Sequence, residues 1–338
     1  MGTALSLGLK ERHSVEIISM VNDRNNKGCD IISTDWFYNP FKLNDNVKRI
    51  VKKYTNNNFD LIICAIEPFL PLAARLKKKL EIKHFIFIGH GTYSYFPFMD
   101  FPYSIYNRYF AKAIDLMIVP SEFTLGKVKQ WFKGNVDVIP WGVDCQKYYP
   151  IEGIVKENHF VFVGEQKERK GITVLLLAYE KLRQDHPESK LYVVGKKNNI
   201  FVERVKEMAL ENHVIFTGQL SHKELLEMYS KCLCLVLPSV NTERSFEGYG
   251  LVHLEANACG IPSIGSRGTA NAEVIDENLS GFTCRQKDIV DIYEKMTMIL
   301  ESTEKEKMSS DALKYAKDHG WNKVIKALED KIESKFIL

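Results

Sequence analysis

The segment SFEGYGLVHLEA, residues 245–256, follows the apolar run CLVLP (234–238) and opens a helical pattern. Glycines after a strand let the backbone approach a ligand closely, and the first N–H groups of the following helix can then bind an anion. Glu247 is expected in the loop at the carboxyl end of the strand, and Glu255 about two helical turns further on. Two carboxylates beside a phosphate cradle could bind hydroxyl-rich groups on either side of it. The ordinary alternative is an acidic residue near the positive end of a helix dipole and an exposed Glu255.

Short apolar runs alternate with helical patterns on both sides of this segment. The expected strands are 15–20, 60–66, 84–89, 115–120 and 137–141, followed by 159–164, 190–195, 214–218, 234–238 and 262–266. The helical patterns between them include 172–186, 202–212 and 221–232. Continuous apolar runs are typical of strands buried on both faces, and their alternation with helices predicts parallel sheets with right-handed crossovers. We therefore expect two doubly wound α/β domains with ligands at the carboxyl ends of their strands.

The two series of strands also set the expected domain boundaries. Residues 149–153, YPIEG, read as a linker between an N-terminal domain, 1–150, and a C-terminal domain, 151–319. The length of 338 residues agrees with two domains of ordinary size. The chain starts with a helical pattern, 3–13, whereas a doubly wound domain normally starts with a strand and a glycine-rich turn. We therefore expect an N-terminal domain that lacks its first strand.

Composition excludes several classes of protein. Charged residues make up 26% of the chain and the net charge is only +3, which gives no argument for a nucleic-acid partner. Seven cysteines, mostly in apolar runs, predict buried thiols in a reducing compartment. The sequence has no apolar stretch long enough for a membrane span and no secretory leader, so we expect a cytoplasmic protein. GHGTYS, 89–94, matches only the first two glycines of a dinucleotide fingerprint, which argues against a nicotinamide dehydrogenase.

Seven residues separate Glu247 from Glu255, and EGYGLVHLEA resembles the E-x7-E motif of glycosyltransferase family 4, retaining enzymes of the GT-B fold. Neighbouring segments resemble the family in order and spacing. Residues 159–182 resemble its phosphate-binding strand, loop and helix, 214–239 the approach to the motif, and 256–282 the part that follows. The resemblance implies a GT-B fold in which the last helix, about 320–338, joins the N-terminal domain.

Carried over by position, the resemblance implies a donor site in the C-terminal domain. Lys170 would pair with the donor diphosphate, Glu247 would hold hydroxyls of the transferred sugar, and Glu255 would hold those of the ribose. His90 would lie near the sugar and the acceptor. Taken alone, Lys170 reads as a solvated lysine in a charged loop, and His90 could be an ordinary loop histidine. The other donor-binding residues would be Gly248, Tyr249, Gly250 and Leu251 around the phosphates, Arg169 beside them, and Leu220 at the base.

The implied reaction moves a sugar from a UDP- or GDP-sugar to a glycan or a lipid-linked acceptor, with retention of the anomeric configuration. A lysine and helix-terminal amides can stabilise the leaving phosphate, so neither a metal nor another cofactor is expected. Cys232 and Cys234 form a CxC pair in an apolar run, and we expect their thiols to pack in the core.

Two departures from the family pattern affect this site. The family usually has an arginine after the glycine of FVG, where this chain has Glu165, and Lys167 or Arg169 is the candidate replacement. The second departure is the first strand, which the N-terminal sequence does not supply. Both motivate an alternative function, namely a catalytically impaired GT-B protein that binds a nucleotide sugar or a partner glycosyltransferase.

Basic residues are concentrated in the N-terminal half. Residues 1–150 carry 20 basic and 14 acidic side chains, whereas residues 151–338 carry 26 and 29. The lysines of 75–83 lie close in sequence to an aromatic-rich segment, 93–110. Solvated helix faces and core packing would explain both features. The alternative is a surface that docks on an anionic membrane, with the protein peripheral on its inner face, to reach a lipid-linked acceptor.

Overall fold

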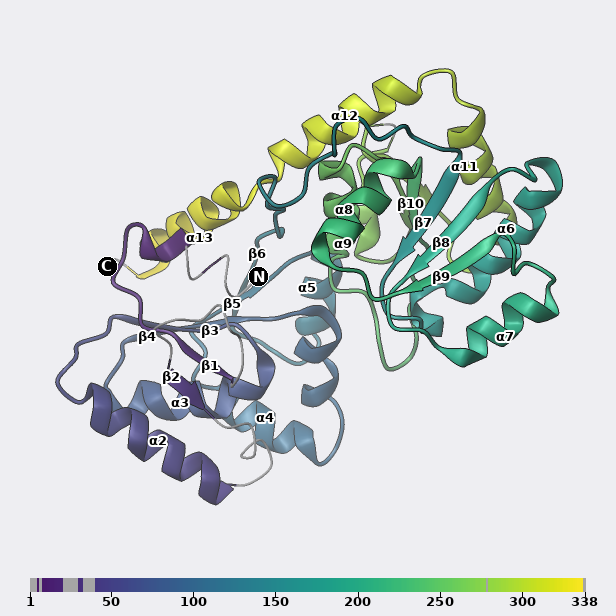
Figure 1. The fold of residues 1–338 in the computed structure, drawn as a ribbon. Coiled ribbons are helices and arrows are strands. Elements are labelled where there is room, and N and C mark those ends of the chain that lie inside the picture. The colour runs from purple at the N-terminus through teal and green to yellow at the C-terminus, as the bar shows by residue number, and fades with distance from the viewer. Residues whose placement is uncertain (1–4, 6–7, 21–29, 33–39, 278, 337–338) are drawn as a thin grey trace. The chain divides into compact units, whose positions relative to one another are not determined.

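The computed structural model describes residues 5, 8–20, 30–32, 40–277 and 279–336. The chain forms two compact units, of which the first comprises residues 1–140 and 321–338 and the second residues 141–320. Each unit has its own parallel sheet with helices packed on it (Figure 1).

The first unit is built around a four-stranded parallel sheet and a separate parallel pair of strands. The sheet has the order β3 (Leu61–Cys64), β4 (His84–Ile88), β5 (Leu116–Val119) and β6 (Asn135–Val138), and the pair is β1 (Ile18–Met20) with β2 (Asp30–Ile32). Five of these strands lie at or within two residues of the expected runs, whereas β2 was not predicted. Residues 8–10, ahead of β1, are helical, in agreement with the pattern expected there.

Three helices lie side by side along one face of this sheet (Figure 1), namely α2 (Pro40–Tyr54), α3 (Leu70–Lys79) and α4 (Tyr103–Ala111). Their apolar side chains share one core with Phe85 and Phe87 of β4. Arg75 of α3 connects the layer, because its guanidinium donates a hydrogen bond to Asn44 of α2 and lies 5.5 Å from the ring centre of Phe110 of α4.

Further helices complete the first unit. The 3-10 turns are η1 (Glu67–Phe69), η2 (Gly91–Ser94) and η3 (Phe96–Phe98), and the α-helices are α5 (Glu122–Val128) and α13 (Trp321–Phe336). Glu329 attaches α13 to the start of the chain, since it is buried and its Oε2 accepts a 2.7 Å hydrogen bond from Arg12. On the same helix, Lys331 lies 3.3 Å from the carboxylate of Asp137.

The second unit contains a six-stranded parallel sheet with the order β12-β11-β10-β7-β8-β9. Its strands are β7 (His159–Val163), β8 (Lys190–Val194), β9 (Val214–Gly218), β10 (Cys234–Leu237), β11 (Ser263–Ser266) and β12 (Gly281–Cys284). The chain runs from β7 outward to β9 and then returns to place β10 on the other side of β7. The two halves of the sheet therefore diverge between β7 and β10, and doubly wound sheets bind ligands at such a point.

Helices cover both faces of this sheet, which explains why its strands are apolar throughout. Phe160 and Phe162 pack on one face against α6 (Ile172–Asp185), α7 (Asn199–Glu207) and α11 (Ile289–Glu301). Val161 packs on the other face against α8 (His222–Lys231) and α9 (Leu251–Ala258). The remaining helices are η4 (Glu168–Lys170), α10 (Asn271–Val274) and α12 (Lys305–Asp318).

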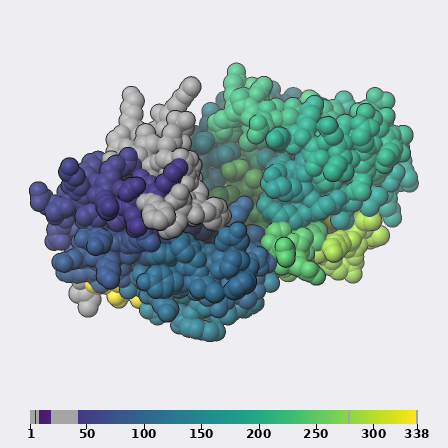
Figure 2. Space-filling view, turned by 90° about the horizontal axis from the view of Figure 1, so that it is seen from below, coloured from purple at the N-terminus to yellow at the C-terminus, as the bar shows by residue number. Residues whose placement is uncertain are grey.

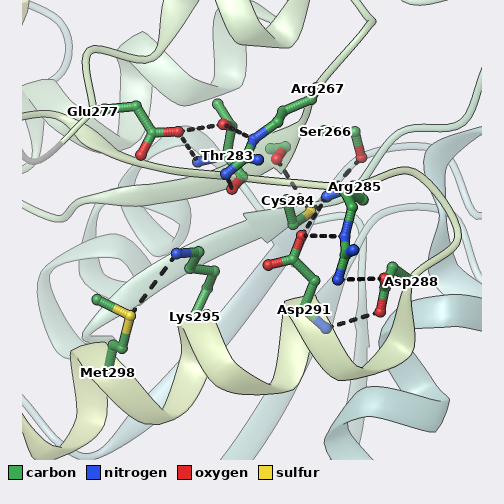
Figure 3. A network of polar contacts seen from close by, with 11 residues as sticks. Ser266, Arg267, Glu277, Thr283, Cys284, Arg285, Asp288, Asp291, Lys295 and Met298 are labelled. Atoms are coloured by element: carbon green, nitrogen blue, oxygen red, sulfur yellow. Dashed lines mark hydrogen bonds and ion pairs between the residues drawn. The ribbon is translucent and has the colours of Figure 1, made fainter.

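The edge strand β12 was not predicted, because its four residues, GFTC, are only partly apolar. Polar side chains contribute to its attachment beside the core packing of Phe282 and Cys284 (Figure 3). Thr283 donates its amide to Glu277 at 2.9 Å, and its hydroxyl accepts a 2.9 Å hydrogen bond from Arg267. Beyond the strand, the amide of Arg285 donates to Asp291 of α11 at 2.7 Å.

The cysteines within the described residues are unpaired. Six of the seven are described there, all six are free thiols, and five of them are buried. Cys232 and Cys234 have no exposed surface, which confirms that their thiols pack in the core. In the described part of the chain, no helix combines the length and the apolar character that crossing a bilayer requires.

Candidate functional site

Two loops of the second unit meet at the carboxyl ends of β7 and β10. Gly171, the N-cap of α6, has φ +75°, and a Cβ on it would lie 1.9 Å from the carbonyl oxygen of Pro238. The amide of Val240 donates a 2.7 Å hydrogen bond to the carbonyl of Arg169. Only glycine fits this approach, so the contact fixes the loop after β7 against the loop after β10.

This contact brings charged side chains from both loops together. Lys170 forms an ion pair with Glu247 through Nζ and Oε2, and each of the two side chains is 13% exposed. Arg169 Nη1 lies 3.4 Å from the same Oε2 of Glu247. The hydroxyl of Ser239 also donates a 3.4 Å hydrogen bond to this oxygen. The structure therefore places Lys170, Arg169 and Glu247 in one cluster. Ser239 was not predicted.

Two opposing effects set the protonation of Glu247. Burial acts to raise the pKa of its carboxyl group, but the neighbouring charges of Lys170 and Arg169 outweigh it and hold that pKa below its usual value. Glu247 is therefore a carboxylate at neutral pH. The cluster carries two cations and one anion, and the excess positive charge suits an anionic ligand.

The structure separates the two candidates for replacing the family arginine. Lys167 Nζ pairs with Glu165 at 2.7 Å, and both side chains are 56% exposed. Arg169 instead points to Glu247 and is 26% exposed. Arg169 is thus the basic residue of this loop that contacts Glu247 together with Lys170, while Lys167 forms an ion pair with Glu165 at the surface.

The expected phosphate-binding turn has the conformation that its glycines allow. Gly250 has φ +91° and is the N-cap of α9, so Leu251 is the first helical residue. The first N–H groups of a helix have no partner within it and can bind an anion. Gly248 precedes this turn, and Tyr249 is 5% exposed, with burial raising the pKa of its hydroxyl.

Glu255 lies on α9 and is only partly exposed. The hydroxyl of Tyr148 donates a hydrogen bond to its carboxylate. Burial raises the pKa of Glu255, and the bond from Tyr148 partly offsets this effect. Leu220 lies just beyond β9, where it lines a shallow surface hollow with Ile154 and Met228.

Two buried polar residues beneath the turn were not predicted. His253, on the first turn of α9, has no exposed surface, and neither of its ring nitrogens has a hydrogen-bond partner within the described residues. Burial lowers the pKa of His253 to about 3, so the ring is neutral. Asn271 Oδ1 is likewise buried without a described partner, and it lies 2.6 Å from the place where Gly250 would carry a Cβ.

His90 belongs to the first unit and follows β4. Its Nε2 lies 2.6 Å from the carbonyl oxygen of Ala65, which can only accept, so Nε2 carries the hydrogen. Its amide donates a 3.0 Å hydrogen bond to Glu67. Burial lowers the pKa of His90 to about 4 and raises that of Glu67 to about 7. Glu67 was not predicted, although it also follows a strand, β3, of the same sheet.

Comparison with known families accounts for nearly the whole chain. The family model described as "Glycosyl transferases group 1" matches residues 147–319, and that described as "Glycosyltransferase Family 4" matches residues 3–147. The chain belongs to the family 4 glycosyltransferases. The family predicted from the E-x7-E segment is thereby confirmed.

Three similar proteins show how this glycosyltransferase compares with known sequences and structures. It is 27% identical to an uncharacterized glycosyltransferase of Methanocaldococcus jannaschii over 262 aligned residues. The alignment covers 75% of this chain and 69% of that relative. Among solved structures, sucrose-phosphate synthase from Thermosynechococcus elongatus is 18% identical with a TM-score of 0.76, over 98% of this chain and 92% of the other. Anabaena HepE, solved in complex with UDP and glucose, is 18% identical with a TM-score of 0.71, and the match covers 88% of this chain and 83% of HepE. These likenesses confirm that the glycosyltransferase has the GT-B fold.

Proposed function

We propose that this glycosyltransferase transfers a sugar from a nucleoside diphosphate sugar with retention of configuration and without a metal. The observation that carries the proposal is the cluster of Lys170, Arg169 and Glu247 at the divergence point of the sheet. This cluster and the start of α9 both belong to the carboxyl end of the sheet. They offer cations and amides to a diphosphate and a carboxylate to sugar hydroxyls.

The proposed chemistry uses these groups in the following way. The bond between the anomeric carbon and the diphosphate oxygen breaks, and negative charge grows on that oxygen. Lys170, Arg169 and the amides near Gly248 to Leu251 stabilise that charge. The acceptor hydroxyl attacks the same face of the sugar and gives its proton to the leaving phosphate. Glu247 holds sugar hydroxyls, and His90 contacts the sugar and the acceptor.

The nucleotide site is proposed around two further residues. Glu255 accepts the ribose hydroxyls, and the backbone near Leu220 contacts the base. The donor is a UDP- or GDP-sugar. HepE, which shares the fold, was solved with UDP and glucose, and this supports a nucleotide sugar as the donor.

The proposed acceptor is a glycan or a lipid-linked saccharide. For a lipid-linked acceptor, the protein would be cytoplasmic and would act at the inner face of an anionic membrane. The 1–150 region then serves as the acceptor-side domain, together with the last helix, and 151–319 as the donor domain.

A catalytically impaired protein that only binds a nucleotide sugar is the second candidate. Glu165 is the observation that favours it, because an acidic side chain follows the glycine of FVG. Two contacts argue against this second candidate. Lys167 pairs with Glu165, and Arg169 supplies a cation to the cluster.

One experiment separates these functions. The melting temperature of the protein is measured with UDP, GDP and their sugars, and donor hydrolysis and transfer are then assayed with the ligand that raises it. A shift together with turnover is expected. A shift without turnover on any acceptor supports the binding protein, and no shift with any nucleotide contradicts both functions.

A further inference from the structure

The first unit exposes a patch of large apolar side chains around the start of α4. The exposed fractions reach 79% at Phe101, 66% at Ile105 and 67% at Tyr109. Met99, Tyr103 and Tyr106, from the same eleven-residue stretch, are also exposed. We define the apolar patch as Met99, Phe101, Tyr103, Ile105, Tyr106 and Tyr109.

The same segment already has its own anchors in the core. Phe98 is 1% exposed and stacks on Trp131 with ring centres 3.9 Å apart, and Phe110 is 7% exposed beneath Arg75. Core packing therefore explains Phe98 and Phe110 but not the apolar patch. Of the two alternatives left open for the aromatic segment 93–110, packing thus accounts for only some of its side chains.

Basic side chains accompany the apolar patch on the same helix layer. Helices α2, α3 and α4 contain ten lysine or arginine residues and one acidic residue, Asp45. Eight of the ten are exposed, among them Lys78 and Lys79 at the end of α3. Figure 2 looks at the molecule from the side of these helices, whose indigo to blue atoms form a continuous surface. Because Arg75 contacts both α2 and α4, the charges and the apolar patch belong to one layer.

We infer that this layer is a docking surface for an anionic phospholipid bilayer. Tyrosine and phenylalanine place their rings at the boundary between head groups and acyl chains, while lysines reach the phosphates around them. A protein partner fits less well, because lysine is depleted in protein interfaces. The inference gives the proposed transferase access to a lipid-linked acceptor, but bilayer binding needs neither donor nor acceptor, so the two ideas can fail separately.

The test is co-sedimentation of the full chain with vesicles of phosphatidylcholine alone and of phosphatidylcholine mixed with phosphatidylglycerol. We expect binding to the mixed vesicles at low salt and weaker binding as salt rises, because counterions screen the lysines. Reversing two charges, Lys78→Glu with Lys79→Glu, should weaken partitioning by about 25-fold or more, since each basic residue near the surface contributes about fivefold. The matched control is Lys196→Glu with Lys197→Glu, an adjacent exposed pair in the second unit.

The apolar contribution is tested by Ile105→Ser, for which the chain offers a close control. Ile200, in the second unit, is 68% exposed against 66% for Ile105. Ile105→Ser should weaken binding to the mixed vesicles by about tenfold, whereas Ile200→Ser should leave it unchanged. Both side chains are exposed, so equal melting temperatures will show that the variants are folded.

Three outcomes would overturn the inference. One is the absence of sedimentation with the mixed vesicles at low salt. Another is equal loss in the patch variants and in their controls. The third is a concentration-dependent dimer, seen by analytical ultracentrifugation without vesicle binding and abolished by Ile105→Ser, which would assign the patch to a second copy of the chain.

Discussion

Lys170 and Glu247 lie 77 residues apart in the sequence and form an ion pair between two loops. Each side chain is only 13% exposed, so the pair is shielded from much of the screening that weakens surface ion pairs. Arg169 makes the second cationic contact to the same oxygen, Oε2, at 3.4 Å. A change at Lys170 therefore affects both the charge available to a ligand and the environment of a buried carboxylate.

Lys170→Ala should slow sugar transfer by about a hundredfold, on the order of 3 kcal/mol of transition-state stabilisation. It should also lower the free energy of unfolding, by at most about 3 kcal/mol, because Arg169 still neutralises part of the charge on Glu247. Steady-state kinetics and urea unfolding measure the two effects. Lys167→Ala, which removes an exposed lysine paired with Glu165, should keep both values near those of the parent. A Lys170→Ala protein with the parental rate would refute the assigned role.

Gly171→Ala should disrupt the site through the backbone. Residue 171 has φ +75°, and the added methyl group would lie 1.9 Å from the carbonyl oxygen of Pro238. Gly153 has a similar φ of +80°, but no atom lies within 4 Å of the position its Cβ would take. Gly153→Ala should therefore cost only the left-handed strain, about 1 kcal/mol, whereas Gly171→Ala should cost several times more and abolish transfer.

Thermal unfolding and transfer assays on both glycine variants check this comparison. Equal losses of stability at the two positions would show that the contact between Gly171 and Pro238 has no role of its own.

Stability should depend on pH through Glu67 and His90. Burial raises the pKa of Glu67 to about 7, whereas the pKa in the unfolded chain is near 4.5. The protonated Glu67 therefore contributes fully to the free energy of unfolding below about pH 4.5, and this contribution is lost as pH rises through about 7. Burial lowers the pKa of His90 to about 4. The neutral His90 therefore contributes fully to the free energy of unfolding above about pH 6.5, and this contribution is lost as pH falls toward 4. The two slopes oppose each other in the parent.

Glu67→Gln should remove the opposing Glu67 slope and leave those of the buried histidines His90 and His253, because glutamine can still accept the amide hydrogen bond of His90 but does not titrate. Urea unfolding between about pH 4 and 8 should then show stability rising with pH up to about 6.5 and level above it. The exposed Glu81→Gln is the control and should leave the parental profile unchanged. A Glu67→Gln profile identical to the parent would contradict the raised pKa.

His253→Leu should stabilise the second unit by about 1 kcal/mol, because it replaces a buried ring whose nitrogens have no described partner. The parent should also lose stability as pH falls from about 6.5 toward 3, since burial lowers the pKa of His253 to about 3, and the leucine variant should not lose this part. His253→Gln keeps a polar group in place and should show no gain. A leucine variant less stable than the parent would show that the imidazole has a partner after all.

The sequence predicted the strands that have a continuous apolar run and missed β2 and β12. β7 was predictable because Phe160 and Val161 pack on opposite faces and leave a continuous apolar run. β12 was not, because an edge strand fastened by Thr283 and Glu277 has no such run. Strand order is likewise absent from a linear pattern, and it is the pairing of β10 with β7 that brings Glu247 to Lys170.

Site residues were predictable only where a spaced motif carried them. Glu247 was found through the E-x7-E motif, and Lys170 through the resemblance of residues 159–182 to the family's phosphate-binding strand, loop and helix. Ser239, His253 and Asn271 are single polar residues within apolar or glycine-rich segments, and no periodic pattern distinguishes them. Their relevance becomes visible only in the folded chain, where Ser239 donates to Glu247 and the buried His253 and Asn271 have polar atoms without a described partner.

The contact of Gly171 with Pro238 also restricts how the second unit can respond to a ligand. The same loops are joined by the backbone hydrogen bond from Val240 to Arg169. Neither loop can therefore travel without the other. An arriving anion would be met by rotation of Lys170 and Arg169 about their own side-chain bonds, on the timescale of rotamer exchange rather than of loop closure. Recognition of such an anion by the second unit would then depend on side-chain rotamers and not on movement of the two loops.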